Sequence, residues 1–362
     1  MAPDAPENNE HASDVAGAGL EVGVGAVGDQ EPTEALPSPA VLPSAHAERL
    51  ADLEAKVARA VTRSRAPATL RAYHSDWRDF TLWCETIGAS ALPATPSVVA
   101  AYLAERAEPP DDRRPAAVST LTRRMAAIGE GHRAAGHPNP CADELVRTTM
   151  AGLRRILGVA PVRKKALVTA DLRAMVATLS PSKLLDIRDR ALLLLGFAGG
   201  MRRSELVGLD VDDLNPVDEG LLVILRSSKT DQEGRGRRVE IVYGTNAATC
   251  PVRAVRAWLV ASDITSGAVF RPVDRHGRIG ATRLSERAVA LVVKRHALGL
   301  GLAATSYAGH SLRRGMATTA SKGGASERTI MRTTGHTSAA TVQGYIEDGE
   351  LFSDPASKYL GL

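Results

Sequence analysis

Two short runs of β-branched and apolar residues stand in a chain whose other apolar stretches repeat at helical spacing. The runs cover residues 221–226 and 237–242, and the polar segment 227–234 joins them, which predicts one β-hairpin. We therefore predict a mainly α-helical protein with a small antiparallel β-sheet. Apolar residues recur three and four positions apart in the predicted helices, at residues 97–108, 118–135, 142–158, 186–199 and 283–299.

Length and composition predict two folded domains after an unstructured tail. A chain of 362 residues exceeds the usual length of one domain. Residues 1–44 are rich in Ala, Gly, Pro and Glu and contain no aromatic residue, so they bury too little apolar surface to offset the entropy of ordering. We expect a disordered acidic tail at 1–44, a helical domain at 45–160, a basic linker at 161–166 and a second domain at 167–362. Thr169 is the expected N-cap of the first helix in the second domain.

A stripe of large side chains marks the core of the helical domain. Leu70, Tyr73, Trp77, Phe80 and Cys84 follow one another at spacings of three and four residues, which places them on one face of a helix. This spacing favours a packed core over a platform on which bases stack.

Charge is unevenly distributed along the chain. The formal net charge is +4, but residues 1–44 carry eight acidic residues and no Lys or Arg, so the remainder has a formal charge of +12. A folded part this basic predicts a polyanionic partner, double-stranded DNA, because Lys and Arg displace counterions from phosphates. The alternative is a solvated surface balanced by nearby acids. The residues predicted to contact DNA phosphates are Arg123, Arg124, Arg154, Arg155, Arg163, Lys164 and Lys165.

The cysteines and the N-terminus predict neither a disulfide framework nor a zinc cluster nor a membrane anchor. Cys84, Cys141 and Cys250 are far apart and form no C-x-x-C pair. The N-terminus lacks a basic segment followed by an apolar core, and the longest apolar run, residues 191–201, is too short to cross a bilayer. We expect a cytoplasmic, nucleoid-associated protein without a membrane partner, a metal or another cofactor.

Four short motifs follow one another in the second half of the chain. They are Gly-Met-Arg-Arg-Ser-Glu-Leu at 200–206, Ser-Lys-Thr at 228–230, His-Ser-Leu-Arg at 310–313 and Gly-His at 335–336, with Tyr345 nine positions after the last. Each motif occurs by chance in many proteins, whereas their joint order and spacing is specific. Together they resemble the tyrosine recombinase, or phage integrase, family from about residue 166 to the C-terminus.

The resemblance implies a fold and a reaction. The fold is a helical core-binding, SAM-like domain, to which residues 45–160 are similar, followed by an α+β catalytic domain, and the two are expected to grip DNA from opposite sides. The implied reaction is site-specific recombination, in which DNA strands are cut and rejoined through a 3′-phosphotyrosine without a metal or ATP. The resemblance also implies a homotetramer that assembles on two DNA sites.

Two arginines have the chemistry to bind a reacting phosphate. Charge that spreads over the non-bridging oxygens in the transition state is stabilised by fixed cations, and guanidinium groups bind such oxygens in pairs. Arg202 and Arg313 are predicted to do so, and the G-x-R-x-x-E spacing selects Arg202 over the neighbouring Arg203. Glu205, three residues after Arg202, is predicted to orient the guanidinium and not to transfer a proton.

A lysine and two histidines are the next candidates. The resemblance implies that Lys229, near the hairpin tip, protonates the 5′ oxygen as it leaves, whereas an isolated hairpin lysine only adds solubility. His310, on the same helix side as Arg313, can act as a general base or bind the phosphate. For His336, which follows a helix-ending Gly, the resemblance implies transition-state stabilisation. A lone histidine is more often structural, and two histidines can indicate a metal site.

Tyr345 is the predicted nucleophile. A phenol has a pKa of about 10, so it needs a base or a strong positive field to attack at neutral pH. Tyr307 and Tyr359 are the competing tyrosines, but neither follows a Gly-His pair. Two departures from the family pattern, Ser311 and Arg314, stand where an acid and a histidine are common, and neither removes a catalytic group.

Two other functions fit the same scaffold. A type IB topoisomerase-like enzyme uses the same chemistry on one duplex as a monomer. A DNA-binding protein that has lost catalysis binds DNA with strong salt dependence but never becomes attached to it. The forms of the motifs favour the recombinase over the topoisomerase-like enzyme, and the presence of all six polar positions favours it over the binding-only protein.

Overall fold

The chain divides into two units between residues 63 and 64. The first contains α1 (Ser44–Arg63). In the computed structural model the described residues are 44–63, 66–110, 113–159, 164–226 and 236–350, with residues 357 and 360. The predicted acidic tail up to residue 43, Arg163 and the hairpin tip with Lys229 lie outside them.

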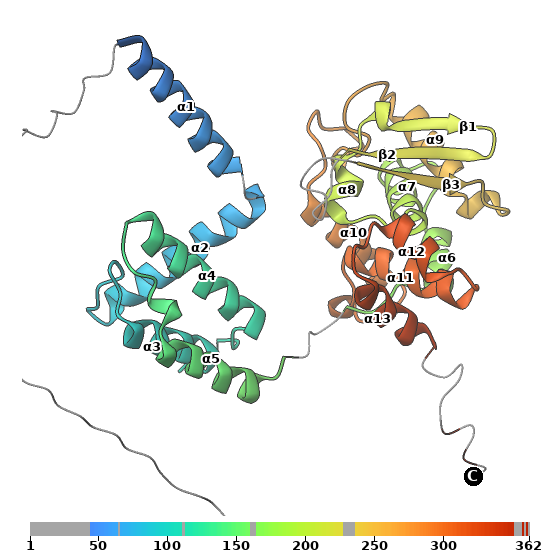
Figure 1. Ribbon diagram of the computed structural model, residues 1–362. Helices are drawn as coiled ribbons and strands as arrows, with labels where there is room; N and C mark the ends of the chain where they lie inside the picture. The colour runs from blue at the N-terminus through green and yellow to red at the C-terminus, as the bar shows by residue number, and fades with distance from the viewer. Residues whose placement is uncertain are drawn as a thin grey trace, which may run out of the picture. The chain divides into compact units, whose positions relative to one another are not determined.

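Four helices with a core of their own begin the second unit. They are α2 (Pro67–Thr86), α3 (Pro96–Ala107), α4 (Val118–Ala134) and α5 (Glu144–Leu157), and the short 3-10 helix η1 (Pro140–Ala142) precedes α5 (Figure 1). Polar side chains start two of them: Thr95 accepts a hydrogen bond from the Val98 backbone N–H at 3.4 Å, and Asp143 accepts one from that of Leu145 at 2.8 Å. The observed bounds of α3, α4 and α5 agree with the predicted helices 97–108, 118–135 and 142–158 to within two residues at each end.

The predicted stripe on α2 is core, most strongly at its C-terminal end. Phe80 and Cys84 are 0% and 1% exposed, whereas Leu70, Tyr73 and Trp77 are partly buried. Edge-to-face and tilted aromatic contacts occupy this face, so the stripe packs inside the domain as expected. The rest of this core comes from the other helices: Tyr102, Leu103, Leu121, Ile128, Val146 and Met150.

A second core organises the C-terminal part of the described chain. Its helices are α6 (Thr169–Ala177), α7 (Leu184–Ala198), α8 (Arg203–Gly208), α9 (Pro251–Ser262), α10 (Glu286–Gly299), α11 (His310–Lys322), α12 (Glu327–Thr334) and α13 (Ala339–Glu350). Short 3-10 helices connect them: η2 (Val211–Asp213), η3 (Ala247–Thr249) and η4 (Ala304–Ser306).

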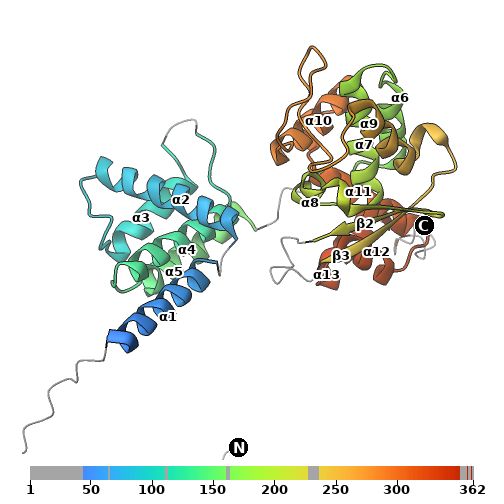
Figure 2. The same ribbon diagram turned by 90° about the horizontal axis from the view of Figure 1, so that it is seen from above.

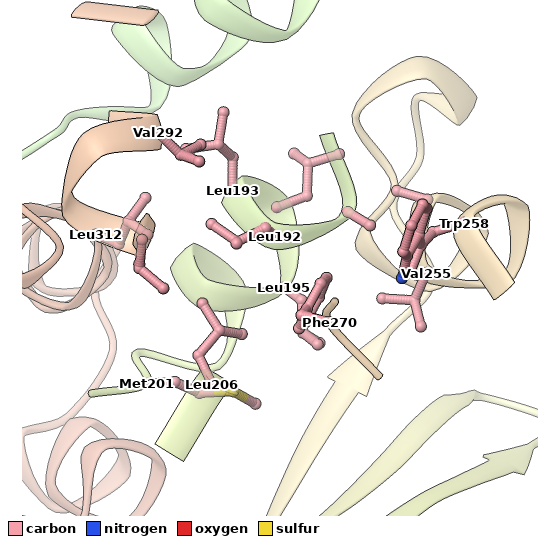
Figure 3. Close-up of a cluster of buried hydrophobic side chains, with 14 of the residues drawn as sticks. Leu192, Leu193, Leu195, Met201, Leu206, Val255, Trp258, Phe270, Val292 and Leu312 are labelled. Carbon is pink, nitrogen blue, oxygen red and sulfur yellow. The ribbon is translucent and has the colours of Figure 1, made fainter. Parts of the chain in front are cut away.

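The central element of this core is α7. Residues 191–196 are consecutively buried, and Figure 3 shows the α7 leucines among side chains that include Trp258 of α9, Val292 of α10 and Leu312 of α11. A helix that is buried on every side has no polar face, which explains why this stretch is the longest apolar run. Within the described ranges, no helix has both the length and the hydropathy needed to cross a membrane.

The sheet is antiparallel, with the strands in the order β1-β2-β3. β2 (Gly220–Leu225) pairs with β3 (Arg237–Val242), which confirms the predicted hairpin, and β3 lies beside α12 (Figure 2). Alternate residues face the core, since Val223 pairs with Val239, Leu221 pairs with Ile241, and all four are buried. β1 (Leu214–Val217) was not predicted, because it is short, contains a proline and shows no apolar alternation.

Two features at the start of the catalytic domain differ from the sequence-based expectation. Thr169 is not the N-cap of α6; that position is Val168, without a side-chain cap, and the Thr169 hydroxyl instead lies 3.5 Å from that of Thr319. The backbone N–H of Lys165 donates to the Ser306 carbonyl at 2.8 Å, so the described part of the predicted linker is held by the domain that follows it. Tertiary contacts override the local capping preference here.

Candidate active site

The start of α11 places a histidine and an arginine on one side of a helix. The helix begins at His310, as predicted, and the Ser311 hydroxyl accepts a hydrogen bond from the Ala308 backbone N–H at 3.0 Å. Arg313, one turn later, is 0% exposed. Its Nη1 donates to the Gly200 carbonyl at 2.8 Å.

A tight turn carries the first arginine motif to the same place. Gly200 has a φ of +54°, a conformation that favours glycine, and a Cβ there would displace the Met316 side chain, whose Cε would lie 2.3 Å away. Arg202 is the N-cap of α8, and Glu205 accepts hydrogen bonds from the Arg202 backbone N–H at 2.7 Å and from its Nη1 at 2.6 Å. This geometry agrees with the predicted orienting role of Glu205.

A third arginine, which the sequence analysis missed, joins this pair. Arg237 is the first residue of β3, and its Nη2 donates to Oε2 of Glu205 at 2.8 Å. Its Nη1 donates to the carbonyl of Thr333 in the last turn of α12. The signal that could have found it is its register, because Arg237 shares the inward parity of Val239 and Ile241 on the same strand.

His336 has both ring nitrogens engaged. Gly335 ends α12 in the left-handed region, with a φ of +65°, as the sequence predicted. Nε2 of His336 lies 2.9 Å from Nη2 of Arg313, and Nδ1 lies 2.7 Å from Oγ1 of Thr334. Because a guanidinium only donates, Nε2 must accept, and Nδ1 then carries the proton. The ring is therefore a neutral imidazole that accepts a hydrogen bond from Arg313.

Tyr345 of α13 completes the site. It is 8% exposed, and its hydroxyl lies 3.0 Å from Nε2 of His310. Its ring centroid is 5.6 Å from that of His336 and 5.8 Å from Cζ of Arg314. Residues 35 positions apart thus meet at hydrogen-bonding distance, whereas Tyr307, the described competitor, packs in the domain core.

The site has an excess of positive charge. In the described part of the chain, Glu205 is the carboxylate that pairs with Arg202 and Arg237, and it lies 4.0 Å from Arg313. Burial and the nearby Arg202 charge lower the pKa of Arg313 to about 9. Burial and the Arg313 charge lower the pKa of His336 to about 3. Such a cluster favours an anion with several oxygens.

The pKa of His310 is lowered although the residue is exposed. The protein packed around its ring, followed by the charge of Arg313 and of Arg314, disfavours the protonated form. A neutral imidazole whose Nε2 faces a hydroxyl can accept that proton. Among the described residues, no group of three or more His, Cys, Asp or Glu side chains is arranged to hold a metal ion.

The predicted DNA-contact residues have different surroundings. Arg154 and Arg155 are exposed in the last turn of α5, and Lys165 is exposed. Arg124 is enclosed: its side chain is 16% exposed, and its Nη1 lies 3.0 Å from Oδ2 of Asp79. The other two are also bonded within the protein: Nε of Arg123 lies 2.7 Å from Oδ2 of Asp76, and the Lys164 ammonium donates to the Thr305 carbonyl at 2.7 Å.

A mixed catalytic domain with a buried tyrosine facing an arginine cluster defines a protein that transfers phosphoryl groups through a tyrosine. Comparisons with known proteins agree with this class. The profile of the phage integrase family matches residues 165–350. An integrase/recombinase XerD homolog of Selenomonas ruminantium is 39% identical over 319 residues, which cover 87% of this chain and 92% of that protein. The tyrosine recombinase XerC of Mycobacterium sp. (strain KMS) is 31% identical over 295 residues, or 79% of this chain and 90% of the relative.

Solved structures show the same fold. The XerH site-specific recombinase bound to a palindromic difH substrate, in a post-cleavage complex, superposes with a TM-score of 0.54 at 15% identity, over 73% of this chain and 72% of that chain. A lambda integrase dimer bound to a COC′ core site has a TM-score of 0.50 at 17% identity, over 80% and 95% of the two chains. The chain described here belongs to the phage integrase family: it is a site-specific tyrosine recombinase.

Proposed function

We propose that Tyr345 cuts DNA by attacking a backbone phosphate, with His310 as the proton acceptor. The phenol proton passes to Nε2 of His310, the tyrosine oxygen bonds to phosphorus, and the bond from phosphorus to the 5′ oxygen breaks. The products are a 3′-phosphotyrosine and a 5′ hydroxyl. The observation that carries this proposal is the 3.0 Å distance between Nε2 of His310 and the Tyr345 hydroxyl, in a site where desolvation by the surrounding protein and positive charge lower the pKa of His310.

The arginines stabilise the transition state. Arg202 and Arg313 bind the non-bridging oxygens, where negative charge spreads as the bonds exchange. His336 lies against Arg313. When Arg313 turns toward the phosphate and the ring proton moves from Nδ1 to Nε2, His336 donates to a phosphate oxygen as well. Lys229, whose role rests on the family resemblance, protonates the 5′ oxygen. The bond energy is kept in the phosphotyrosine, so the reaction needs no ATP, and the arginines supply the fixed cations, so it needs no metal.

Rejoining follows the same path in reverse with a new partner. A 5′ hydroxyl from a second duplex gives its proton to Lys229 and attacks the phosphotyrosine. This releases Tyr345, which takes back its proton from His310. In this proposal four protomers assemble on two DNA sites in the cytoplasm. The exposed Arg154, Arg155 and Lys165 contribute phosphate contacts, which position the protein without selecting a sequence.

A covalent adduct is the direct test. Purified protein is incubated with nicked duplexes drawn from DNA flanking its own gene, and a peptide–DNA adduct at Tyr345 is sought by denaturing gel and mass spectrometry. Tyr345→Phe is expected to abolish the adduct while DNA affinity stays within about twofold of the wild type, because binding rests on phosphate contacts outside this hydroxyl. Tyr307→Phe removes another buried hydroxyl of the same domain and is the matched control, with adduct formation retained.

The other outcomes separate the rival functions. DNA that is bound but never attached at Tyr345 would contradict the proposal and support a binding-only protein. An adduct with relaxation of supercoiled plasmid, but with no exchange between two duplexes, would support a topoisomerase-like activity instead.

A further inference from the structure

We infer that Arg237 is a positioning residue for strand cleavage: it holds the Glu205 carboxylate and the end of α12 so that Arg202, Arg313 and His336 converge on the phosphate. This inference rests on the proposed function. Arg237 lies outside the four motifs, and it need not touch the DNA.

The sheet fixes where the Arg237 side chain begins. The residue pairs with Leu225 of β2, and its parity along the strand directs the side chain inward. Arg238, the next residue, is exposed on the opposite face. Two adjacent arginines of the same strand therefore differ in position and not in charge, and only the Arg237 side chain is directed toward the site.

One nitrogen of Arg237 supports the first arginine motif. Oε2 of Glu205 accepts from Nη2 of Arg237 at 2.8 Å and from the Arg202 backbone N–H at 2.7 Å, while Oε1 accepts from Nη1 of Arg202 at 2.6 Å. Glu205 is 4% exposed, so water cannot readily replace a lost donor. Without Arg237, we expect the carboxylate to turn toward Arg313, 4.0 Å away, and to draw that guanidinium from the phosphate.

The other side of the guanidinium supports His336. Nη1 donates to the Thr333 carbonyl, and a Cβ on Gly335 would lie 2.8 Å from Nε of Arg237. The guanidinium therefore packs directly against the glycine that ends α12, one residue before His336. One side chain thus connects β3, the Glu205 carboxylate and the turn that carries His336.

Three variants test the inference in the full-length protein. Arg237→Gln removes the charge, Arg237→Lys keeps the charge but cannot serve both acceptors, and Arg238→Gln is the matched control. We expect Arg237→Gln to slow single-turnover adduct formation at saturating DNA about 100-fold, as loss of one well-placed transition-state contact does. Arg237→Lys should form the adduct about tenfold faster than Arg237→Gln, and the affinity of both variants for DNA should change less than about threefold. Arg238→Gln should cleave at the wild-type rate.

Modified DNA identifies which atoms Arg237 acts through. A methylphosphonate at the scissile position replaces one charged non-bridging oxygen, so less negative charge has to be stabilised in the transition state. The ratio of the wild-type rate of adduct formation to the Arg237→Gln rate, called the rate gap below, should therefore shrink at least about tenfold. A sulfur in place of the 5′-bridging oxygen is a leaving group that needs no proton. It should therefore restore the rate of adduct formation by Lys229→Ala but leave the rate gap between wild type and Arg237→Gln unchanged.

Each result decides between distinct alternatives. A gap that is equal on all three substrates would overturn the inference and indicate a merely structural arginine. A gap that closes on the sulfur substrate would also overturn it, because Arg237 would then act through the leaving group. A wild-type protein that forms no adduct on any substrate would overturn the proposed function and this inference together. If Arg237→Gln does not fold, the same comparisons are made with Arg237→Lys.

Discussion

The helical domain and the catalytic domain each contain a cluster of arginines around carboxylates. The carboxylates offset more of the positive charge in the helical domain, where Asp76 and Asp79 lie beside Arg106, Arg123 and Arg124. In the helical domain, Asp76 accepts two hydrogen bonds from Arg123, at 2.7 and 3.0 Å. Asp79 accepts from Nε of Arg106 at 3.1 Å and from the Tyr102 hydroxyl at 2.5 Å. In the catalytic domain, Glu205 is shared by Arg202 and Arg237, with Arg313 at 4.0 Å.

The pKa shifts follow this difference. The hydrogen bond with Asp76 raises the pKa of Arg123. For Arg106, burial acts to lower the pKa, but the Asp79 charge together with the hydrogen bonds to Tyr102 and Asp79 raises it. Burial and the Arg202 charge instead lower the pKa of Arg313 to about 9. Arginines whose charge is mostly offset by carboxylates stabilise a fold, whereas three arginines that share the single carboxylate of Glu205 produce a positive potential that a bound phosphate lowers. The same residue types thus serve structure in one domain and catalysis in the other.

The largest expected effect is at Arg313, where loss of the side chain should impair catalysis far more than stability. Arg313→Gln should reduce the rate of adduct formation about 1000-fold, because a fixed donor to the transition-state oxygens is lost. The free energy of unfolding of the catalytic domain should change by no more than about 1 kcal/mol, because the deleted charge is one that its surroundings disfavour. Single-turnover cleavage and hydrogen exchange of α7 peptides measure the two quantities. A large loss of stability with cleavage intact would contradict a catalytic role for Arg313 and show that it is a structural arginine.

The converse is expected at Asp76. This carboxylate is 4% exposed, and Asp76→Asn removes its charge from the hydrogen bonds with Arg123, which should destabilise the helical domain by about 2 kcal/mol. Hydrogen exchange should accelerate in α2 and α4 and stay unchanged in α7 and α11. At a temperature where the variant is folded and DNA is saturating, the rate of adduct formation should stay within about threefold of the wild type. A chemical defect as large as that of Arg313→Gln would contradict a structural role.

The histidines of the active site predict a pH dependence of stability. The pKa of His336 is about 3 in the folded protein and about 6.5 in an unfolded chain, so between these values only the unfolded chain binds the proton. Stability is therefore complete above about pH 6.5 and falls as the pH drops toward 3, by at most about 2 kcal/mol between pH 7 and pH 5. His336→Gln should flatten this slope in urea unfolding followed by hydrogen exchange, whereas His276→Gln, at an exposed position of the same domain, should not.

The smallest expected effect is the response to a simple anion. Inorganic phosphate at a concentration well above its dissociation constant should raise the midpoint of thermal unfolding of the catalytic domain by about 3 °C, because it binds only the folded cluster. Arg313→Gln should lose this shift, and Arg124→Gln, which alters the matched cluster, should keep it. A shift that depended on Arg124 and not on Arg313 would place the anion site in the wrong domain.

Local sequence patterns determined much of this protein. Apolar spacing predicted the long helices and the hairpin, and the Gly-His pair predicted the left-handed end of α12 before His336. The order of the motifs predicted the family and brought Arg202, Glu205 and Tyr345 into one expected site. These features could be predicted because periodicity, turn chemistry and motif spacing are properties of neighbouring residues.

Only the tertiary structure decided which charges are matched. Arg123 and Arg124 looked like DNA ligands in the sequence, but they lie beside Asp76, more than 40 positions away along the chain. Arg237 carried no motif, yet it meets Glu205 across 32 positions and Thr333 across 96. His310 and Tyr345 became partners only because α11 and α13 pack together. A sequence fixes which groups are present, whereas packing at ångström distances fixes which of them share a proton or a charge.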